Sequence, residues 1–120
     1  MLSVMVIEDE LLLLRITSEF LKEEGFEVIE ACTFTEAIAE LDSGRCVNAI
    51  LSDVSLPGPM DGLAFVSWAH QHYPSVPIFL TSGNGDLVRK SAVDLVGDAR
   101  FLPKPYHQEE LARRLRSLLV

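Results

Sequence analysis

Basic residues and cysteines are scarce in this chain of 120 residues. There are 10 Lys and Arg against 18 Asp and Glu, which gives a net charge of −8. Such a surface lacks the basic stripe that displaces counterions from a nucleic-acid backbone, so direct nucleic-acid binding is disfavoured. The two cysteines, Cys32 and Cys46, form no CxxC pair. They give no disulfide framework, and we expect two buried free thiols in a reducing compartment.

Long apolar runs are also missing. No segment approaches the roughly 20 apolar residues that cross a bilayer. Six of the first seven residues are apolar, but the run stops at Glu8 and lacks the basic flank and cleavage site of a signal peptide. We therefore expect a cytoplasmic protein without membrane contact. Apolar residues make up 48% and charged residues 23%, a globular balance, and the length suits one domain over residues 1–120.

Short apolar runs alternate with segments of helical periodicity. The expected strands are 4–7, 26–30, 48–52, 77–80 and 100–102. The expected helices are about 10–24, 33–41 (capped by Thr33 or Thr35), 61–72, 86–95 and 107–119. Strict alternation of this kind predicts an α/β fold, a doubly wound five-stranded parallel sheet.

The apolar spacing also predicts which helix faces are buried. In the first, third and last helices the expected inward residues are Leu13, Ile16, Phe20 and Leu21, then Leu63, Val66 and Ala69, then Leu111, Leu115 and Leu118. Three histidines and the single tryptophan have no spacing that suits a metal site or a phosphohistidine. We interpret them as surface or packing residues: His70, His72, His107 and Trp68.

Chemically reactive groups follow four of the expected strands. They are Glu8-Asp9, Asp53, Thr81-Ser82 and Lys104. The carboxyl ends of parallel strands line one crevice of an open sheet, so these groups should converge. An acidic pair alone is typical of a helix N-terminus, but the arrival of a third carboxylate from another strand favours a site. Three close carboxylates need a counter-charge, and Mg²⁺, with Mn²⁺ as an alternative, prefers such oxygen ligands.

Asp53 is the best candidate nucleophile. A carboxylate can attack phosphorus to form an acyl phosphate, and a bound cation would neutralise the transferred oxygens. Lys104 supplies a second positive charge, pairing with Asp53 at rest or holding a phosphate oxygen after transfer. Pro105 favours a cis peptide that directs this lysine. Ser82 offers a hydroxyl donor, and Gly83 allows close approach of the backbone.

Together these motifs resemble those of the response-regulator receiver domain (CheY-like superfamily), and the resemblance runs from end to end. It implies a (βα)5 flavodoxin-like sheet in the order 2-1-3-4-5. It also implies that Glu8, Asp9, Asp53 and the backbone carbonyl of Ser55 bind Mg²⁺, and that Asp53 is the phosphoacceptor.

The resemblance assigns the remaining motifs as well. It implies that Lys104 is the charge contact and that Ser82 is the switch hydroxyl. Thr81 is the near alternative, and strand alternation sends the two hydroxyls to opposite faces. The switch aromatic is implied to be Phe101, which lacks the hydroxyl of the commoner tyrosine; a plain core phenylalanine is the other interpretation.

The loops contain one departure from the family and two positions at which the family adjusts its rate of dephosphorylation. The segment 56–62 is one residue longer than the family's usual spacing between the phosphoacceptor and its Asp-Gly pair. Ser55 and Asn84 occupy positions where the family aids or blocks the water that attacks the acyl phosphate.

The resemblance further implies a phosphorelay protein. Its partners would be a histidine kinase or histidine phosphotransfer protein and a downstream protein target, contacted through the fourth helix, fifth strand and last helix. It would catalyse only its own aspartyl phosphorylation and dephosphorylation, as a monomer or weak dimer. Because no output domain follows the last helix, we expect a stand-alone receiver. A receiver excised from a hybrid histidine kinase or longer regulator is the alternative.

Two rival functions have specific requirements. An aspartate-nucleophile phosphatase of the haloacid-dehalogenase type needs a second aspartate two residues after the nucleophile, where this chain has Ser55. A flavodoxin-like cofactor binder needs a phosphate-binding loop of Ser, Thr and Gly after the first strand, where this chain has acidic residues. Both rivals are therefore disfavoured.

Overall fold

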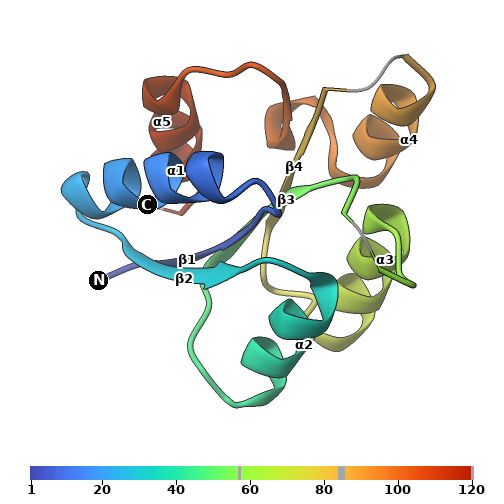
Figure 1. The fold of residues 1–120 in the computed structure, drawn as a ribbon, viewed down its shortest axis with the longest axis horizontal. Coiled ribbons are helices and arrows are strands. Elements are labelled where there is room, and N and C mark those ends of the chain that lie inside the picture. The colour runs from blue at the N-terminus through green and yellow to red at the C-terminus, as the bar shows by residue number, and fades with distance from the viewer. Residues whose placement is uncertain (57, 84–85, 120) are drawn as a thin grey trace.

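The computed structural model describes residues 1–56, 58–83 and 86–119. Within them, strands and helices alternate along the whole chain (Figure 1). The strands are β1 (Ser3–Ile7), β2 (Glu27–Ala31), β3 (Ala49–Asp53), β4 (Ile78–Ser82) and β5 (Phe101–Pro103). The helices are α1 (Leu11–Glu23), α2 (Phe34–Asp42), α3 (Gly62–His72), α4 (Asp86–Val96) and α5 (Gln108–Leu119), with a 3-10 turn η1 (Asp98–Arg100) before β5.

The sheet is parallel throughout, in the order β2-β1-β3-β4-β5. This confirms the predicted fold class and strand order. Each expected strand is displaced by one or two residues: β1 starts one residue earlier, the other four strands start one residue later, and β4 runs on through Ser82. The 3-10 turn η1 was not predicted. It is separated from the end of α4 by Gly97 alone, and its three residues are too few to show a helical periodicity in the sequence.

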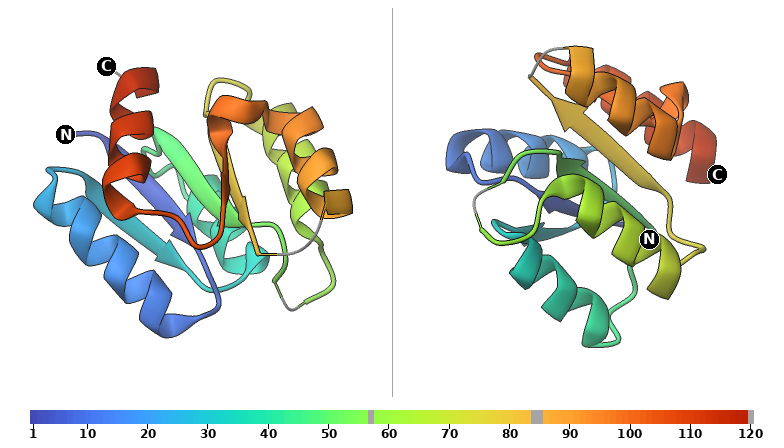
Figure 2. Two further views of the ribbon diagram at one scale, coloured as in Figure 1. Left: turned by 90° about the horizontal axis from the view of Figure 1, so that it is seen from above. Right: turned by 90° about the vertical axis from the view of Figure 1, so that its right-hand side faces the viewer.

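Helices cover both faces of the sheet (Figure 2), and an apolar core lies between the sheet and each helix layer. One core packs residues of α2, α3 and α4 against alternate strand residues such as Ile50 and Leu80. The other packs residues of α1 and α5 against the intervening strand residues, such as Leu51 and Phe79. The central strands are therefore buried on both sides, as their nearly continuous apolar runs require.

The start of α2 is a reciprocal cap. The Thr33 hydroxyl accepts a hydrogen bond from the Glu36 backbone N–H at 3.1 Å, and the Glu36 carboxylate accepts one from the Cys32 N–H at 3.0 Å. Of the two threonines that the sequence left open, Thr33 is therefore the cap. The first bond satisfies a backbone donor that the helix itself leaves unpaired, and the second ties the residue before the cap to the first turn.

Replacing Thr33 with alanine should lower the free energy of unfolding by about 1 kcal/mol, because the N-terminal hydrogen bond of α2 is lost. Urea denaturation of the purified protein measures the change. Thr35→Ala is the matched control, since Thr35 is exposed one residue inside the helix. An equal loss in both variants would contradict the assignment of the cap.

Several burial predictions were wrong. Helix α1 buries Leu14, Thr17, Ser18 and Leu21, whereas Ile16 is 48% exposed. Four consecutive leucines at 11–14 made the inward phase of this helix ambiguous. In α5, Leu118 is 41% exposed because it lies in the last turn, beyond the buried Leu115.

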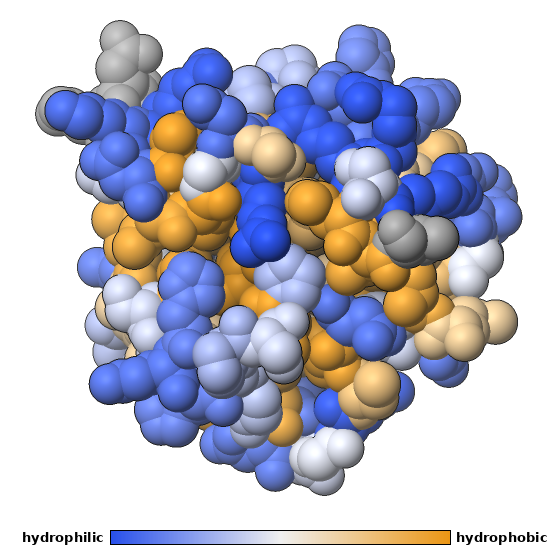
Figure 3. All heavy atoms as spheres, turned by 180° about the vertical axis from the view of Figure 1, so that it is seen from behind, coloured by the Kyte–Doolittle hydropathy of each residue, from blue (hydrophilic) through white to orange (hydrophobic). Residues whose placement is uncertain are grey.

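The two cysteines are free, as predicted, but they are not buried. Cys32 is partly buried after the edge strand β2, and Cys46 is exposed in the connection to β3. No helix in the described ranges combines the length and apolarity of a membrane span. Seen from behind, the surface shows apolar areas interrupted by hydrophilic side chains (Figure 3).

Candidate functional site

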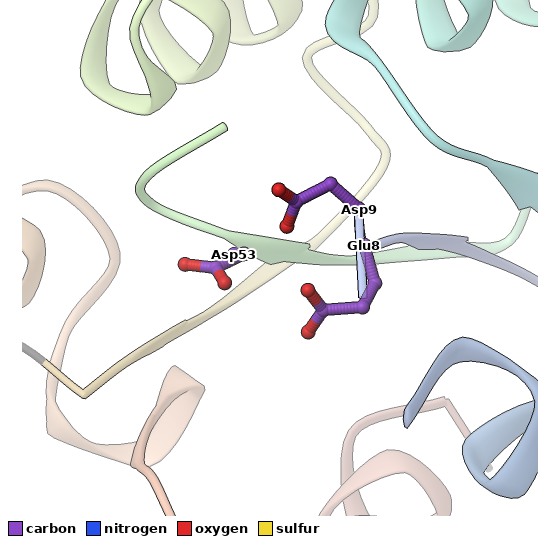
Figure 4. A group of neighbouring side chains, drawn as sticks. All are labelled: Glu8, Asp9 and Asp53. Carbon is purple, nitrogen blue, oxygen red and sulfur yellow. The ribbon is translucent and has the colours of Figure 1, made fainter. Parts of the chain in front are cut away.

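Three carboxylates meet at the carboxyl edge of the sheet. Glu8 and Asp9 directly follow β1, and Asp53 is the last residue of β3. One carboxylate oxygen from each lies within 4.8 Å of the others. Figure 4 shows the three side chains grouped on one side of these two neighbouring strands. The predicted convergence of strand ends therefore brings these acids together, although Asp53 is 44 positions from Asp9 and 45 from Glu8 in the chain.

Lys104 joins two of these carboxylates. Its Nζ donates to Glu8 Oε1 at 2.8 Å and to Asp53 Oδ2 at 2.7 Å. The three side chains are 21%, 7% and 13% exposed respectively, so the contacts are shielded from much of the solvent. The Lys104 backbone N–H also donates to the Ser82 carbonyl at 3.0 Å, and the Lys104–Pro105 peptide is cis. The lysine is thus held at both its backbone and its ammonium group.

Burial and charge act in opposite directions on this ion pair. Burial raises the pKa of Glu8, and the hydrogen bonds from Lys104 and from the Glu10 backbone N–H only partly offset it. For Lys104, burial lowers the pKa, but the hydrogen bonds to Asp53 and Glu8 outweigh it and the pKa is raised overall. The lysine therefore stays charged. The Glu8 carboxylate depends on this positive charge for its own ionisation, because Glu8 is only 5% exposed to solvent.

Asp53 uses its two oxygens differently. Oδ1 accepts a hydrogen bond from the Ser55 backbone N–H at 3.0 Å, and Oδ2 is bound by Lys104. The following residue, Val54, anchors the chain by donating its N–H to the Thr81 carbonyl at 3.0 Å. The carboxylate is therefore oriented at the sheet edge before any ligand arrives.

The two candidate hydroxyls lie at the end of β4 and are both nearly buried. Leu80 packs in the α2–α3–α4 core and Phe79 in the α1–α5 core, so alternation places Ser82 on the side of Leu80 and Thr81 on the side of Phe79. Phe101 belongs to the α2–α3–α4 core and pairs in register with Leu80. Of the two hydroxyls, Ser82 therefore shares the face of the candidate aromatic.

Phe101 is fixed by two arginines. Its ring is 3% exposed, and the Arg89 guanidinium of α4 lies 5.4 Å from the ring centroid. Its carbonyl accepts a 2.8 Å hydrogen bond from Arg114 of α5, which also contacts the carbonyls of Asp98 and Ala99 at 3.3 Å. The aromatic residue therefore contacts both α4 and α5.

The loop after Asp53 contains a close contact that the sequence analysis missed. Gly62, buried at the start of α3, donates its N–H to the Val54 carbonyl at 3.0 Å. A Cβ there would lie 2.7 Å from Val54 Cα and closer still to the carbonyl oxygen. At Gly83, where we expected close approach, the atom that a Cβ would meet among the described residues is Lys104 Cβ at 3.8 Å. The Asp-Gly pair at 61–62 was the available signal.

Of the two positions predicted to affect dephosphorylation, Ser55 and Asn84, the structure describes only Ser55. Ser55 is exposed beside Asp53, and its amide binds the carboxylate. Asn84, together with Pro57 in the longer loop, falls outside the described residues. These positions stay predictions.

The donor set fits a hard divalent cation. It consists of three carboxylates, whose oxygens lie close enough to share one ion, and a single lysine that neutralises part of their charge. Mg²⁺ takes one or two protein carboxylates and keeps several waters, a requirement that this open edge satisfies. Asp9 is exposed and accessible to such an ion, whereas Glu8 is directed toward Lys104.

Comparisons with known proteins agree with this geometry. The family model for the response regulator receiver domain matches residues 4–116. The transcriptional regulatory protein CpxR of Klebsiella pneumoniae is 31% identical over 97% of this chain and 48% of that protein. A protein of Rickettsia bellii named as an NtrX-like response regulator is 28% identical over 97% of this chain and 24% of that protein.

A solved structure shows the same fold. The CheY-like receiver domain protein of Methanospirillum hungatei is 24% identical, with a TM-score of 0.89 over 99% of this chain and 94% of that chain. This chain spans about half the length of the Klebsiella pneumoniae protein and about a quarter of the length of the Rickettsia bellii protein. The family match covers both the sheet and every strand end that contributes to the acidic site, so the chain belongs to the response regulator receiver domain family.

Proposed function

We propose that Asp53 accepts a phosphoryl group from a phosphohistidine on a histidine kinase or histidine phosphotransfer protein. The observation that carries this proposal is the Asp53 carboxylate, oriented by the Ser55 amide and paired with Lys104 beside two further acids. A nucleophile that is already aligned needs little reorganisation before it attacks phosphorus.

The proposed metal ligands are Glu8, Asp9, Asp53 and the Ser55 backbone carbonyl. Bound Mg²⁺, or Mn²⁺, would supply positive charge to the oxygens of the transferred group. An Asp53 oxygen forms the new bond to phosphorus while the bond from phosphorus to the donor nitrogen breaks, and that nitrogen keeps the electron pair. Lys104 then exchanges its contact with the carboxylate for a phosphoryl oxygen, which keeps its charge compensated.

The proposed output is a change of surface on α4, β5 and α5. Ser82 would donate its hydroxyl to a phosphoryl oxygen and so leave its resting position on the face shared with Phe101. Because Phe101 contacts Arg89 of α4 and Arg114 of α5, its movement would reach both helices. A downstream protein that binds one arrangement better would be controlled in this way.

We further propose that the chain is one receiver domain over residues 1–120, a monomer or weak dimer in the cytoplasm. It would catalyse only the gain and loss of its own phosphoryl group. Both curated relatives are named as regulators and are longer than this chain. The partners of this protein are expected to be proteins, since its net charge of −8 opposes direct contact with nucleic acid.

The test is covalent modification by a small phosphodonor. The purified protein is incubated with acetyl phosphate, with and without Mg²⁺, and its intact mass is measured. We expect one phosphoryl group per chain only with Mg²⁺, and none in Asp53→Ala. A hydroxylamine-sensitive adduct would identify an acyl phosphate. Modification that persists in Asp53→Ala, or a wild-type protein that stays unmodified, would contradict the proposal.

A further inference from the structure

A buried polar cluster lies between α1 and α5, behind the connection that carries Lys104. Its centre is Thr17, which is fully buried. The Thr17 Oγ1 accepts a hydrogen bond from Gln108 Nε2 at 3.1 Å, and the Tyr106 hydroxyl lies 3.5 Å from the same oxygen. Tyr106 of the β5–α5 connection and Gln108 at the start of α5 therefore converge on one oxygen of α1.

Polar groups at this interface have an energetic cost. The neighbouring buried residues Leu14, Leu21, Leu111 and Leu115 show that apolar packing suits these helices. The Gln108 Oε1 atom is buried and has no hydrogen-bond partner among the described residues, which is unfavourable. Packing alone would be served by valine at position 17. The threonine adds directional contacts, which fix the relative position of two segments.

These contacts bear on Lys104 through a short connection. At one end, the Lys104 N–H is bound to the Ser82 carbonyl at the sheet edge. At the other end, the Tyr106 ring packs against the α1–α5 core and Gln108 is held by Thr17. Leu13 of α1 lines one groove of about 340 Å³ together with Lys104, Pro105 and Tyr106, so α1 lies directly against the connection.

We propose that Thr17 is a positioning residue for Lys104: it holds the β5–α5 connection against α1, so that the ammonium group keeps its place between Asp53 and Glu8. This inference rests on the proposed function, because the place of the Lys104 ammonium group affects phosphoryl transfer only if Asp53 is the phosphoacceptor. Thr17 lies on the second turn of α1 and is not itself a member of the acidic site.

The experiment measures the rate at which Mg²⁺ and acetyl phosphate modify Asp53. Thr17→Val keeps the side-chain shape and removes the oxygen. We expect its initial rate to fall roughly tenfold, because a small displacement of a charged group away from its aligned position is costly in a transfer step. Tyr106→Phe, which leaves the Thr17–Gln108 contact intact, should have a smaller effect. It also serves as the second variant if Thr17→Val does not fold.

The decisive comparison uses the Lys104→Ala background. If Thr17 acts through Lys104, adding Thr17→Val to Lys104→Ala should not slow the reaction further. An equal loss in both backgrounds would show a general structural effect and overturn the inference, as would a Thr17→Val rate equal to wild type. If the wild-type protein does not react, that result would instead contradict the proposed function, and this inference would fail with it.

Discussion

Lys104→Met should destabilise the protein by about 3 kcal/mol, because it leaves the buried Glu8 carboxylate without its cation. Methionine keeps the length and packing of the side chain but removes the charge. The rate of Asp53 modification should also fall by roughly a hundredfold, since one positive group facing the transferred oxygens is lost. Urea denaturation and intact-mass kinetics measure the two effects separately.

The destabilisation should depend on pH. Burial already raises the pKa of Glu8 in the folded protein, and without Lys104 that pKa rises further. A carboxyl group with a higher pKa in the folded than in the unfolded state binds its proton more tightly when folded. The variant should therefore regain stability as the pH falls and lose it as the pH rises through the folded pKa of Glu8.

Two controls make this prediction specific. Lys104→Arg retains the positive charge and should keep most of the stability. Glu8→Gln combined with Lys104→Met removes the unpaired carboxylate, so the double variant should be more stable than Lys104→Met alone. If the double variant is no more stable, the loss does not arise from the Glu8 charge.

Gly62→Ala should destabilise the protein by on the order of 3 kcal/mol, an overpacking effect at the upper end of the usual range. The added Cβ would lie 2.7 Å from Val54 Cα and 2.8 Å from Val54 C, and these backbone atoms cannot rotate away. Either α3 or the segment after Asp53 must move. The thermal unfolding midpoint should fall by more than ten degrees.

The site should respond as well, since Val54 adjoins Asp53. In the fraction that folds, we expect slower modification by acetyl phosphate. The matched control is Gly83→Ala, where a Cβ would make an ordinary 3.8 Å contact with Lys104 Cβ within the described part of the chain. Its unfolding free energy should change by less than about 1 kcal/mol. Equal stability losses at the two glycines would refute this explanation.

The local sequence pattern was sufficient to predict the fold class and most of the groups at the site. Strand and helix periodicities depend on neighbouring residues, so the alternation predicted the parallel sheet without knowledge of any long-range contact. The site followed from the same logic, because Glu8, Asp53 and Lys104 each come directly after an apolar strand and such ends meet at one edge. The sequence by itself thus determined the fold class and the set of groups at the site.

The tertiary structure decided what those groups contact. Whether Lys104 binds Asp53, Glu8 or both depends on distances between strands, and the structure has it bind both. The inward face of α1, the close approach of Gly62 to Val54 and the bond from Gln108 to Thr17 also join segments distant in sequence. Such contacts depend on how helices and strands pack to within a fraction of an ångström. The spacing of apolar residues along the chain does not determine that packing.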